Sequence, residues 1–139
     1  FGEILRDSMV KMFPDNDPDE AVEIYRSYHR NNFGERIKVF PGMKELLAEL
    51  KARGIKTAVV TSRAGVTTVE GLESYGLSDY FDALVTCDDT DRHKPDPEPV
   101  NIALKKLASK PENALMIGDS MYDIMCARNA GVKSVLVGW

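Results

Sequence analysis

Short apolar runs alternate with amphipathic helical segments from residue 41 to the end of the chain. The runs have the length and the continuous apolar character of strands that are buried on both faces of a sheet. They are 57–61, 83–86, 114–117 and 134–137. Because strands separated by helices of this length favour right-handed crossovers, the pattern predicts a parallel sheet and an α/β fold.

The first forty residues have no such run and predict a small helical layer. Its second helix has a clear start, with Asp17 as the N-cap and Pro18 at the first helical position. His29, on the apolar stripe of that helix, is interpreted as a packing residue. We therefore expect two parts, a helical segment over 1–40 and an α/β core over 41–139.

The composition limits the kinds of partner and the compartment. The chain has 139 residues, the length of about one domain, with 18 basic and 22 acidic side chains and no basic block. Nucleic acid and anionic membranes are therefore poor partners, and no apolar stretch has the length of a membrane-spanning helix. The two cysteines have neither metal-ligand spacing nor a disulfide pattern, so we expect a cytoplasmic protein.

Two aspartates follow the third apolar run. Asp119 comes directly after Gly118, where the strand ends, and Asp123 falls in the first turn of the next helix. Two carboxylates beside a helix N-terminus suit Mg²⁺, which binds one or two carboxylates and keeps its other positions for water and phosphate. A structural alternative fits equally well, in which Ser120 and Asp123 form a capping box and Asp119 is a turn residue.

Polar residues also end the first two apolar runs. Ligands of open parallel sheets bind outside the carboxyl ends of the strands, which here carry Thr61, Ser62 and Arg63, and then Asp88 and Asp89. Each group has a structural alternative. Thr61 is also a common strand-ending residue, Arg63 fits a surface position at a helix start, and the two aspartates fit a polar turn.

Taken in order, these residues resemble the haloacid dehalogenase-like hydrolases, and within them the phosphoglycolate phosphatase-like branch. Val59–Ser62 resembles the second of that family's four motifs, Lys94–Pro97 the third and Gly118–Asp123 the fourth. Phe40–Gly42, followed by an amphipathic helix, resembles the return from a helical cap to the core. The resemblance covers essentially the whole chain. It implies a Rossmann-like parallel sheet with part of an α-helical cap.

The first motif of the family, an apolar strand followed by Asp-x-Asp, is not found. Asp15–Asp17 has the matching letters, but it follows a helical stretch and precedes Pro18, so we interpret it as a helix cap. In the family the first motif precedes the cap. We therefore expect the nucleophile to lie upstream of Phe1, in a part of the protein outside this chain.

The resemblance implies a Mg²⁺-dependent phosphatase that hydrolyses a small phosphorylated metabolite through an aspartyl-phosphate. In this scheme the Thr61 hydroxyl and the Ser62 backbone N–H bind phosphate oxygens. Lys94 places a positive charge against the nucleophile and the phosphate. Asp119 binds Mg²⁺ directly, and Asp123 binds it directly or through water.

Several alternatives stay open at this point. Arg63 either contacts the anionic end of the substrate or lies on the surface, Lys94 fits a solvated loop, and Asp88 and Asp89 either orient Lys94 or form a turn. The family also contains dehalogenases that need no metal, against which the acid pair argues. Without the first motif the chain is also compatible with a non-catalytic binding module. We expect the isolated 139 residues to be inactive on phosphate esters.

Overall fold

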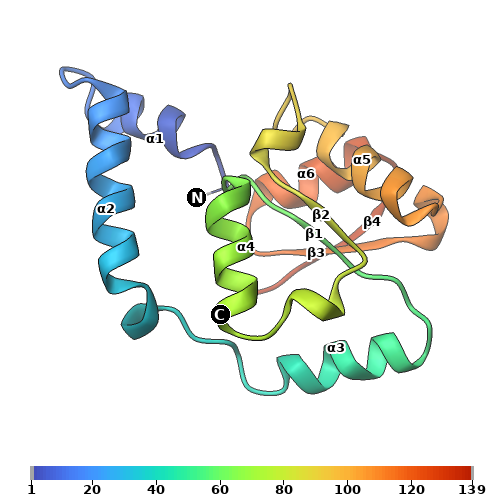
Figure 1. The fold of residues 1–139 in the computed structure, drawn as a ribbon. Coiled ribbons are helices and arrows are strands. Elements are labelled where there is room, and N and C mark those ends of the chain that lie inside the picture. Colours follow the sequence, from blue (N-terminus) through green and yellow to red (C-terminus); the bar gives the residue numbers. More distant parts are fainter. Residues whose placement is uncertain (1, 139) are drawn as a thin grey trace.

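The computed structural model describes residues 2–138, and only the backbone of residues 29–36. Its helices and strands follow the alternation that the sequence predicts (Figure 1). In chain order they are α1 (Leu5–Met12), α2 (Pro18–Arg36), α3 (Met43–Ala52), β1 (Ala58–Val60), α4 (Gly65–Ser74), η1 (Ser78–Tyr80), β2 (Ala83–Val85), η2 (Cys87–Asp89), α5 (Glu98–Leu107), η3 (Pro111–Asn113), β3 (Leu115–Gly118), α6 (Met121–Asn129) and β4 (Lys133–Leu136).

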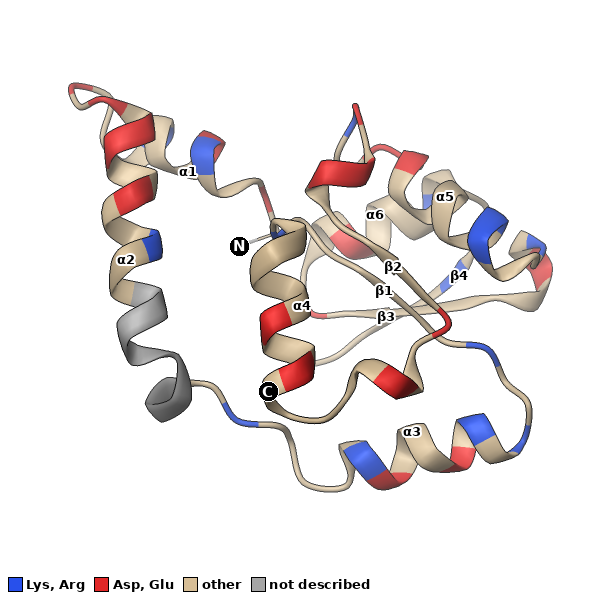
Figure 2. Cartoon of the chain, in the orientation of Figure 1, with Lys and Arg blue, Asp and Glu red and all other residues tan. Residues whose placement is uncertain are grey.

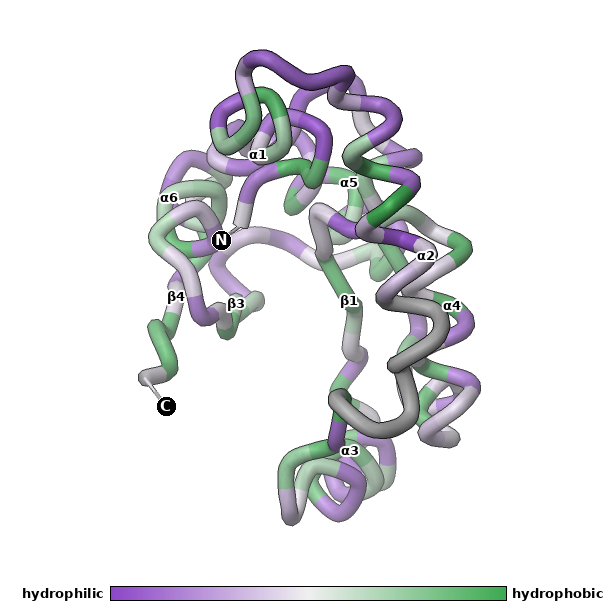
Figure 3. Tube along the Cα trace, turned by 90° about the vertical axis from the view of Figure 1, so that its left-hand side faces the viewer, coloured by the Kyte–Doolittle hydropathy of each residue, from purple (hydrophilic) through white to green (hydrophobic). Residues whose placement is uncertain are grey.

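The four strands pair in parallel, which confirms the predicted α/β class. β1 pairs with β2, with Ala58 opposite Ala83, and β3 pairs with β4, with Leu115 opposite Lys133. Between residues 2 and 138 these are two separate pairs and not the continuous sheet that the alternation predicts. In the side view of Figure 3 a space separates β1 from β3, with β4 farther away.

Backbone hydrogen bonds show which edge of β1 and which edge of β3 has no neighbouring strand between residues 2 and 138. The Thr61 N–H donates to the Val85 carbonyl at 2.9 Å, so Thr61 faces β2. Successive residues of a strand turn their polar groups to opposite sides, so the Val60 carbonyl faces away from β2. On the other pair, the Val137 N–H donates to the Gly118 carbonyl at 2.9 Å, so Gly118 faces β4. The edges of β1 and β3 that turn away from β2 and β4 are unpaired between residues 2 and 138, and in Figure 3 they lie on the two sides of the space between the pairs.

The third apolar run is less buried than its composition predicts. Leu115 and Ile117 are 57% and 62% exposed, so the expectation of a strand buried on both faces is wrong for them. Successive side chains of a strand point to opposite faces, so Leu115 and Ile117 lie on the face of β3 that is turned away from the core. Met116, between them, packs against the core.

Helices α5 and α6 connect the two strand pairs. α5 packs against β1, β2 and α6, and α6 packs against β3 and β4. The buried side chains where these elements meet form the hydrophobic core: Val100, Leu104, Cys126, Ala127 and Val132. This shared core fixes the position of one pair relative to the other without a backbone ladder between them.

The N-terminal helices form a hairpin beside the core (Figure 1). α1 packs on α2, and Arg6 and Asp19 form an exposed ion pair at 2.8 Å. The predicted start of the second helix is confirmed, because α2 begins at Pro18 and the Asp17 carboxylate accepts the Asp19 N–H at 2.9 Å. The division at residue 40 stays a prediction, and the side chain of His29 lies outside the described residues. Within the described residues, each helix is too short or too polar to span a lipid bilayer.

Candidate active site

Lys94 lies between the two strand pairs. Its Nζ donates to the Val60 carbonyl at 2.7 Å and to Asp123 Oδ1 at 2.6 Å, and its side chain is 7% exposed. The Val60 carbonyl belongs to the open edge of β1, and Asp123 lies in the first turn of α6, directly after β3. A single ammonium group therefore joins the carboxyl ends of both pairs. This is where the sequence predicts ligand binding.

Thr61 extends β1 by one residue at the same end. Its N–H pairs with Val85, and its Oγ1 accepts the Arg63 N–H at 3.2 Å. A hydroxyl that accepts this bond still has its own hydrogen to donate to a phosphate oxygen. Because Thr61 follows Val60 directly, its backbone is adjacent to the carbonyl that Lys94 binds. The structure therefore brings these two predicted residues to one strand end.

Asp123 makes two kinds of contact at once. Its Oδ2 accepts the Ser120 N–H at 3.1 Å and the Ser120 hydroxyl at 2.6 Å, while Oδ1 accepts from Lys94. The Asp123 N–H returns a bond to Ser120 Oγ at 3.3 Å, so the capping box predicted as the structural alternative is present. Burial raises the pKa of Asp123, but the bonds from Lys94 and Ser120 outweigh it and hold the pKa below its usual value.

The close approach of β3 to α6 depends on Gly118. A Cβ at this position would lie 2.3 Å from the Asp123 Cβ, which no side chain can tolerate without a backbone shift. Asp119 follows and is exposed at the strand end. Because residue 118 is glycine, β3 can approach α6 closely, and Asp119 and Asp123 lie on the two sides of the turn between them.

The predicted metal ligands are both carboxylates, the oxygen donors that Mg²⁺ prefers. In the part of the chain that the structure describes, no three His, Cys, Asp or Glu side chains gather as a ready metal site. Asp119 is exposed, whereas both Asp123 oxygens already accept hydrogen bonds. This donor set fits an ion held directly by Asp119 and through water by Asp123. The other coordination positions would be filled by water, by phosphate oxygens or by residues outside this chain.

A second contact crosses the space between the strand pairs, and the sequence does not predict it. The Ser62 hydroxyl donates to the Gly2 carbonyl at 2.8 Å. Gly2 lies against α6, where a Cβ would be 2.8 Å from Ser120 Oγ. Next to it, the Tyr122 hydroxyl donates to Glu3 Oε1 at 2.6 Å, a bond that raises the Tyr122 pKa. No local motif links residues this far apart in the sequence, so no sequence signal identifies them.

Arg63, Asp88 and Asp89 do not join Lys94. Asp88 Oδ2 accepts the Gly65 N–H at 2.7 Å, and Asp89 binds Thr86 and Lys106. These bonds match the polar-turn alternative, in which both aspartates hold backbone in place. Arg63 is exposed, so its contact with substrate stays a prediction.

Comparison with known proteins adds independent evidence. The family model for haloacid dehalogenase-like hydrolases matches residues 1–137. A protein of Caldanaerobacter subterraneus is 49% identical over 118 residues, which cover 85% of this chain and 54% of that protein. Pyrophosphatase PpaX of Bacillus cereus is 38% identical over 138 residues, which cover 99% of this chain and 63% of that protein. The chain thus spans less than two thirds of the length of these relatives.

Solved structures of proteins in the same superfamily are also similar to this chain. A hydrolase of the haloacid dehalogenase superfamily from Geobacter sulfurreducens is 33% identical, with a TM-score of 0.66 over 69% of this chain and 49% of that chain. The match to a β-phosphoglucomutase from Clostridium difficile covers 99% of this chain and 66% of that chain, with a TM-score of 0.87. At 23% identity this match shows the fold alone. A structure from Lactobacillus plantarum, described as a phosphoglycolate phosphatase, is 28% identical, with a TM-score of 0.79 over 96% of this chain and 64% of that chain. This match supports the phosphoglycolate phosphatase-like branch.

The match of nearly the whole chain to the family model, together with the motif residues gathered at the strand ends, confirms the resemblance. The chain belongs to the haloacid dehalogenase-like hydrolases.

Proposed function

We propose that the full-length protein is a Mg²⁺-dependent phosphatase that hydrolyses small phosphate monoesters through an aspartyl-phosphate. The observation that carries the proposal is the position of Lys94. Its buried ammonium group bonds to the last carbonyl of β1 and to the first turn after β3. A fixed cation at the meeting point of two strand ends is suited to neutralise a phosphoryl group during transfer.

The nucleophile belongs, in this proposal, to a strand outside the 139 residues that lies between β1 and β3. Two observations support this position. The unpaired edges of β1 and β3 face the same space, and Lys94 reaches across it at the carboxyl ends of the strands. An aspartate at the end of such a strand would lie beside Lys94, which would stabilise its carboxylate.

The residues of this chain then have separate roles. The Thr61 hydroxyl and the Ser62 N–H bind phosphate oxygens, and Lys94 offsets the charge that develops during transfer. Asp119 holds Mg²⁺ directly. Asp123 holds it through water, because its own oxygens are occupied by Lys94 and Ser120. When bound, the ion supplies positive charge against the phosphoryl oxygens.

The names of the relatives support a small phosphorylated substrate, and the substrate class needs a direct test. Because one matched relative is named a pyrophosphatase, pyrophosphate joins small phosphate monoesters among the first compounds to assay. The test uses the full-length protein with p-nitrophenyl phosphate, phosphoglycolate and pyrophosphate, each with Mg²⁺ and with EDTA. Asp119→Asn should abolish turnover, whereas Asp79→Asn, an exposed aspartate on η1, should not.

Two outcomes would reject the proposal. Hydrolysis of a 2-haloacid that is insensitive to EDTA would indicate a metal-independent dehalogenase. Complete inactivity on all phosphate compounds, from a folded full-length protein, would favour a non-catalytic module.

A further inference from the structure

The loop between β1 and α4 carries the proposed phosphate-binding residues, and it is anchored from the neighbouring segment of β2 and η2. The Thr61 N–H donates to the Val85 carbonyl at 2.9 Å, and the Cys87 N–H donates to the Arg63 carbonyl at 3.1 Å. The Gly65 N–H donates to Asp88 Oδ2 at 2.7 Å. The anchors thus fall on residues 61, 63 and 65, and Ser62 lies between the first two.

Asp88 supplies the anchor that the sequence of α4 lacks. The N-cap of α4 is Ala64, which makes no side-chain capping bond, and the first turn contains no acidic residue. The Asp88 carboxylate therefore takes the place of a local cap, from a separate segment of the chain. A Cβ on Gly65 would lie 3.1 Å from Asp88 Oδ2, so the approach is close. Figure 2 shows the acidic turn η2 next to the strand ends.

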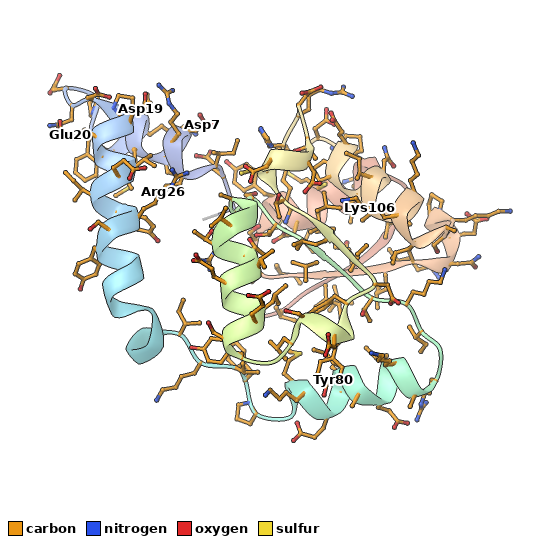
Figure 4. The ribbon with its side chains drawn as sticks, viewed as in Figure 1. Asp7, Asp19, Glu20, Arg26, Tyr80 and Lys106 are labelled. Carbon is orange, nitrogen blue, oxygen red and sulfur yellow. The ribbon has the colours of Figure 1, made fainter. Side chains whose placement is uncertain are left out.

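The turn that carries Asp88 is itself held firmly. Asp89 and Thr86 form a capping box, and Thr86 is buried at the end of β2. Lys106, labelled on α5 in Figure 4, donates to Asp89 Oδ1 at 3.1 Å and to the Leu84 carbonyl at 2.7 Å. The turn of Asp88 is therefore fixed to the packed core, and the bond from Asp88 to Gly65 fixes the loop to that turn.

We propose that Asp88 is a positioning residue for the reaction: by capping α4 it holds the loop of Thr61 and Ser62 in the geometry that binds the phosphoryl group. This inference rests on the proposed phosphatase function. Asp88 itself does not touch the substrate. It acts by fixing the backbone of the loop, because a displaced loop would move both Thr61 and Ser62 away from the phosphoryl group.

The chain contains a matched control at the opposite end of the same strand pair. Asp82 Oδ2 accepts the Thr57 N–H at 2.8 Å, so it makes the same carboxylate-to-backbone bond before β1 that Asp88 makes after it. Both aspartates are exposed. Replacing either one removes a bond of the same type, but only Asp88 lies next to the loop of the candidate site.

The test compares Asp88→Ala, Asp88→Asn and Asp82→Ala in the full-length protein. We expect Asp88→Ala to lower kcat/KM for p-nitrophenyl phosphate about 10- to 100-fold, because a small misplacement of binding groups has effects of this size. Asp88→Asn keeps an oxygen that accepts the Gly65 N–H and should restore most of the rate. Asp82→Ala should lower the melting temperature to a similar extent and leave kcat/KM unchanged.

Amide hydrogen exchange separates this inference from the proposed function. In Asp88→Ala the amides of residues 63–68 should exchange faster than in wild type, and in Asp82→Ala they should not. Equal rates of catalysis in Asp88→Ala and Asp82→Ala would overturn the inference, and so would unchanged exchange at residues 63–68. An inactive wild type would reject the phosphatase proposal, and the exchange measurement would still decide whether Asp88 holds the loop.

Discussion

Lys94 and Asp123 form a buried ion pair in which Nζ and Oδ1 are 2.6 Å apart and the side chains are 7% and 10% exposed. The pair connects the loop before α5 to the first turn of α6. Lys94 also binds the Val60 carbonyl, so it connects the end of β1 to the first turn of α6. Buried pairs of this kind are costly to break from one side, because the remaining charge is left without compensation.

Lys94→Ala should lower both stability and activity. The loss leaves Asp123 buried without its counter-charge, which typically costs about 3–5 kcal/mol of unfolding free energy. Under the proposed function we also expect the full-length protein to lose at least about 2–3 kcal/mol of transition-state stabilisation, the size of one lost electrostatic contact. Urea unfolding and kcat/KM for p-nitrophenyl phosphate measure the two effects.

The double variant Lys94→Ala/Asp123→Asn is the control for this prediction. Asn at 123 removes the uncompensated charge, so the double variant should be more stable than Lys94→Ala alone. A double variant that is less stable than either single variant would contradict the assigned pairing. An unchanged rate in Lys94→Ala would remove Lys94 from the site.

Gly118→Ala should disturb the turn between β3 and α6. The added Cβ would lie 2.3 Å from the Asp123 Cβ, so the backbone must move. Overpacking of this kind costs about 1–3 kcal/mol. Under the proposed function, the shift of the turn should also weaken Mg²⁺ activation of the full-length protein. Gly138→Ala is the matched control, because its Cβ would meet nothing within 4 Å. Equal stability of the two variants, measured by thermal unfolding, would show that the close approach is not needed.

Tyr122→Phe should loosen the contact between the N-terminal segment and α6. The variant removes the bond from the Tyr122 hydroxyl to Glu3, which Lys11 also binds. We expect a small loss in the free energy of unfolding, because a single hydrogen bond is removed. Glu3→Ala should cost less stability in the Tyr122→Phe background than in wild type, because the bond to Tyr122 is already absent there and the bond to Lys11 alone is lost. Fully additive losses would indicate that the two side chains do not interact.

Asp89 should make stability depend on pH in the acid range. Hydrogen bonds from the Thr86 backbone and hydroxyl, and then from Lys106, hold the pKa of Asp89 below its ordinary value. A carboxylate with a lowered pKa binds fewer protons when folded, so its contribution is full above the unfolded value of about 4 and is lost as the pH falls through the folded pKa. The stability difference between wild type and Asp89→Asn should therefore be largest near neutral pH. Urea unfolding at several pH values checks this, and a difference that grows toward pH 3 would contradict it.

Cys87 should react slowly with alkylating reagents. Burial and then the hydrogen bond to Asp88 raise the pKa of the Cys87 thiol to about 11. At pH 8 the thiolate fraction is then about one in a thousand, against about one in four for an ordinary cysteine of pKa about 8.5. Iodoacetamide labelling followed by mass spectrometry measures the rate, and Cys126, fully buried, serves as the internal unreactive reference. Asp88→Asn should accelerate labelling of Cys87, since the nearby negative charge is removed.

Features that depend on residues close together in the chain could be predicted from the amino-acid sequence. The apolar runs predicted four parallel strands, although β1 (Ala58–Val60) is shorter than the predicted run. Asp17 and Pro18 predicted the start of α2, and the spacing of Ser120 and Asp123 predicted the capping box. Such features are visible in sequence because the side chain and the backbone that it contacts are only a few residues apart.

Tertiary packing determines which groups that are distant in the chain come into contact. It paired Lys94 with Asp123, placed Gly2 between Ser62 and Ser120, and gave the cap of α4 to Asp88. It also divided the predicted sheet into two pairs with facing open edges. These contacts depend on how α5 and α6 pack over the strands, and no local pattern encodes that packing, because the contacting residues are brought together only by the folded core.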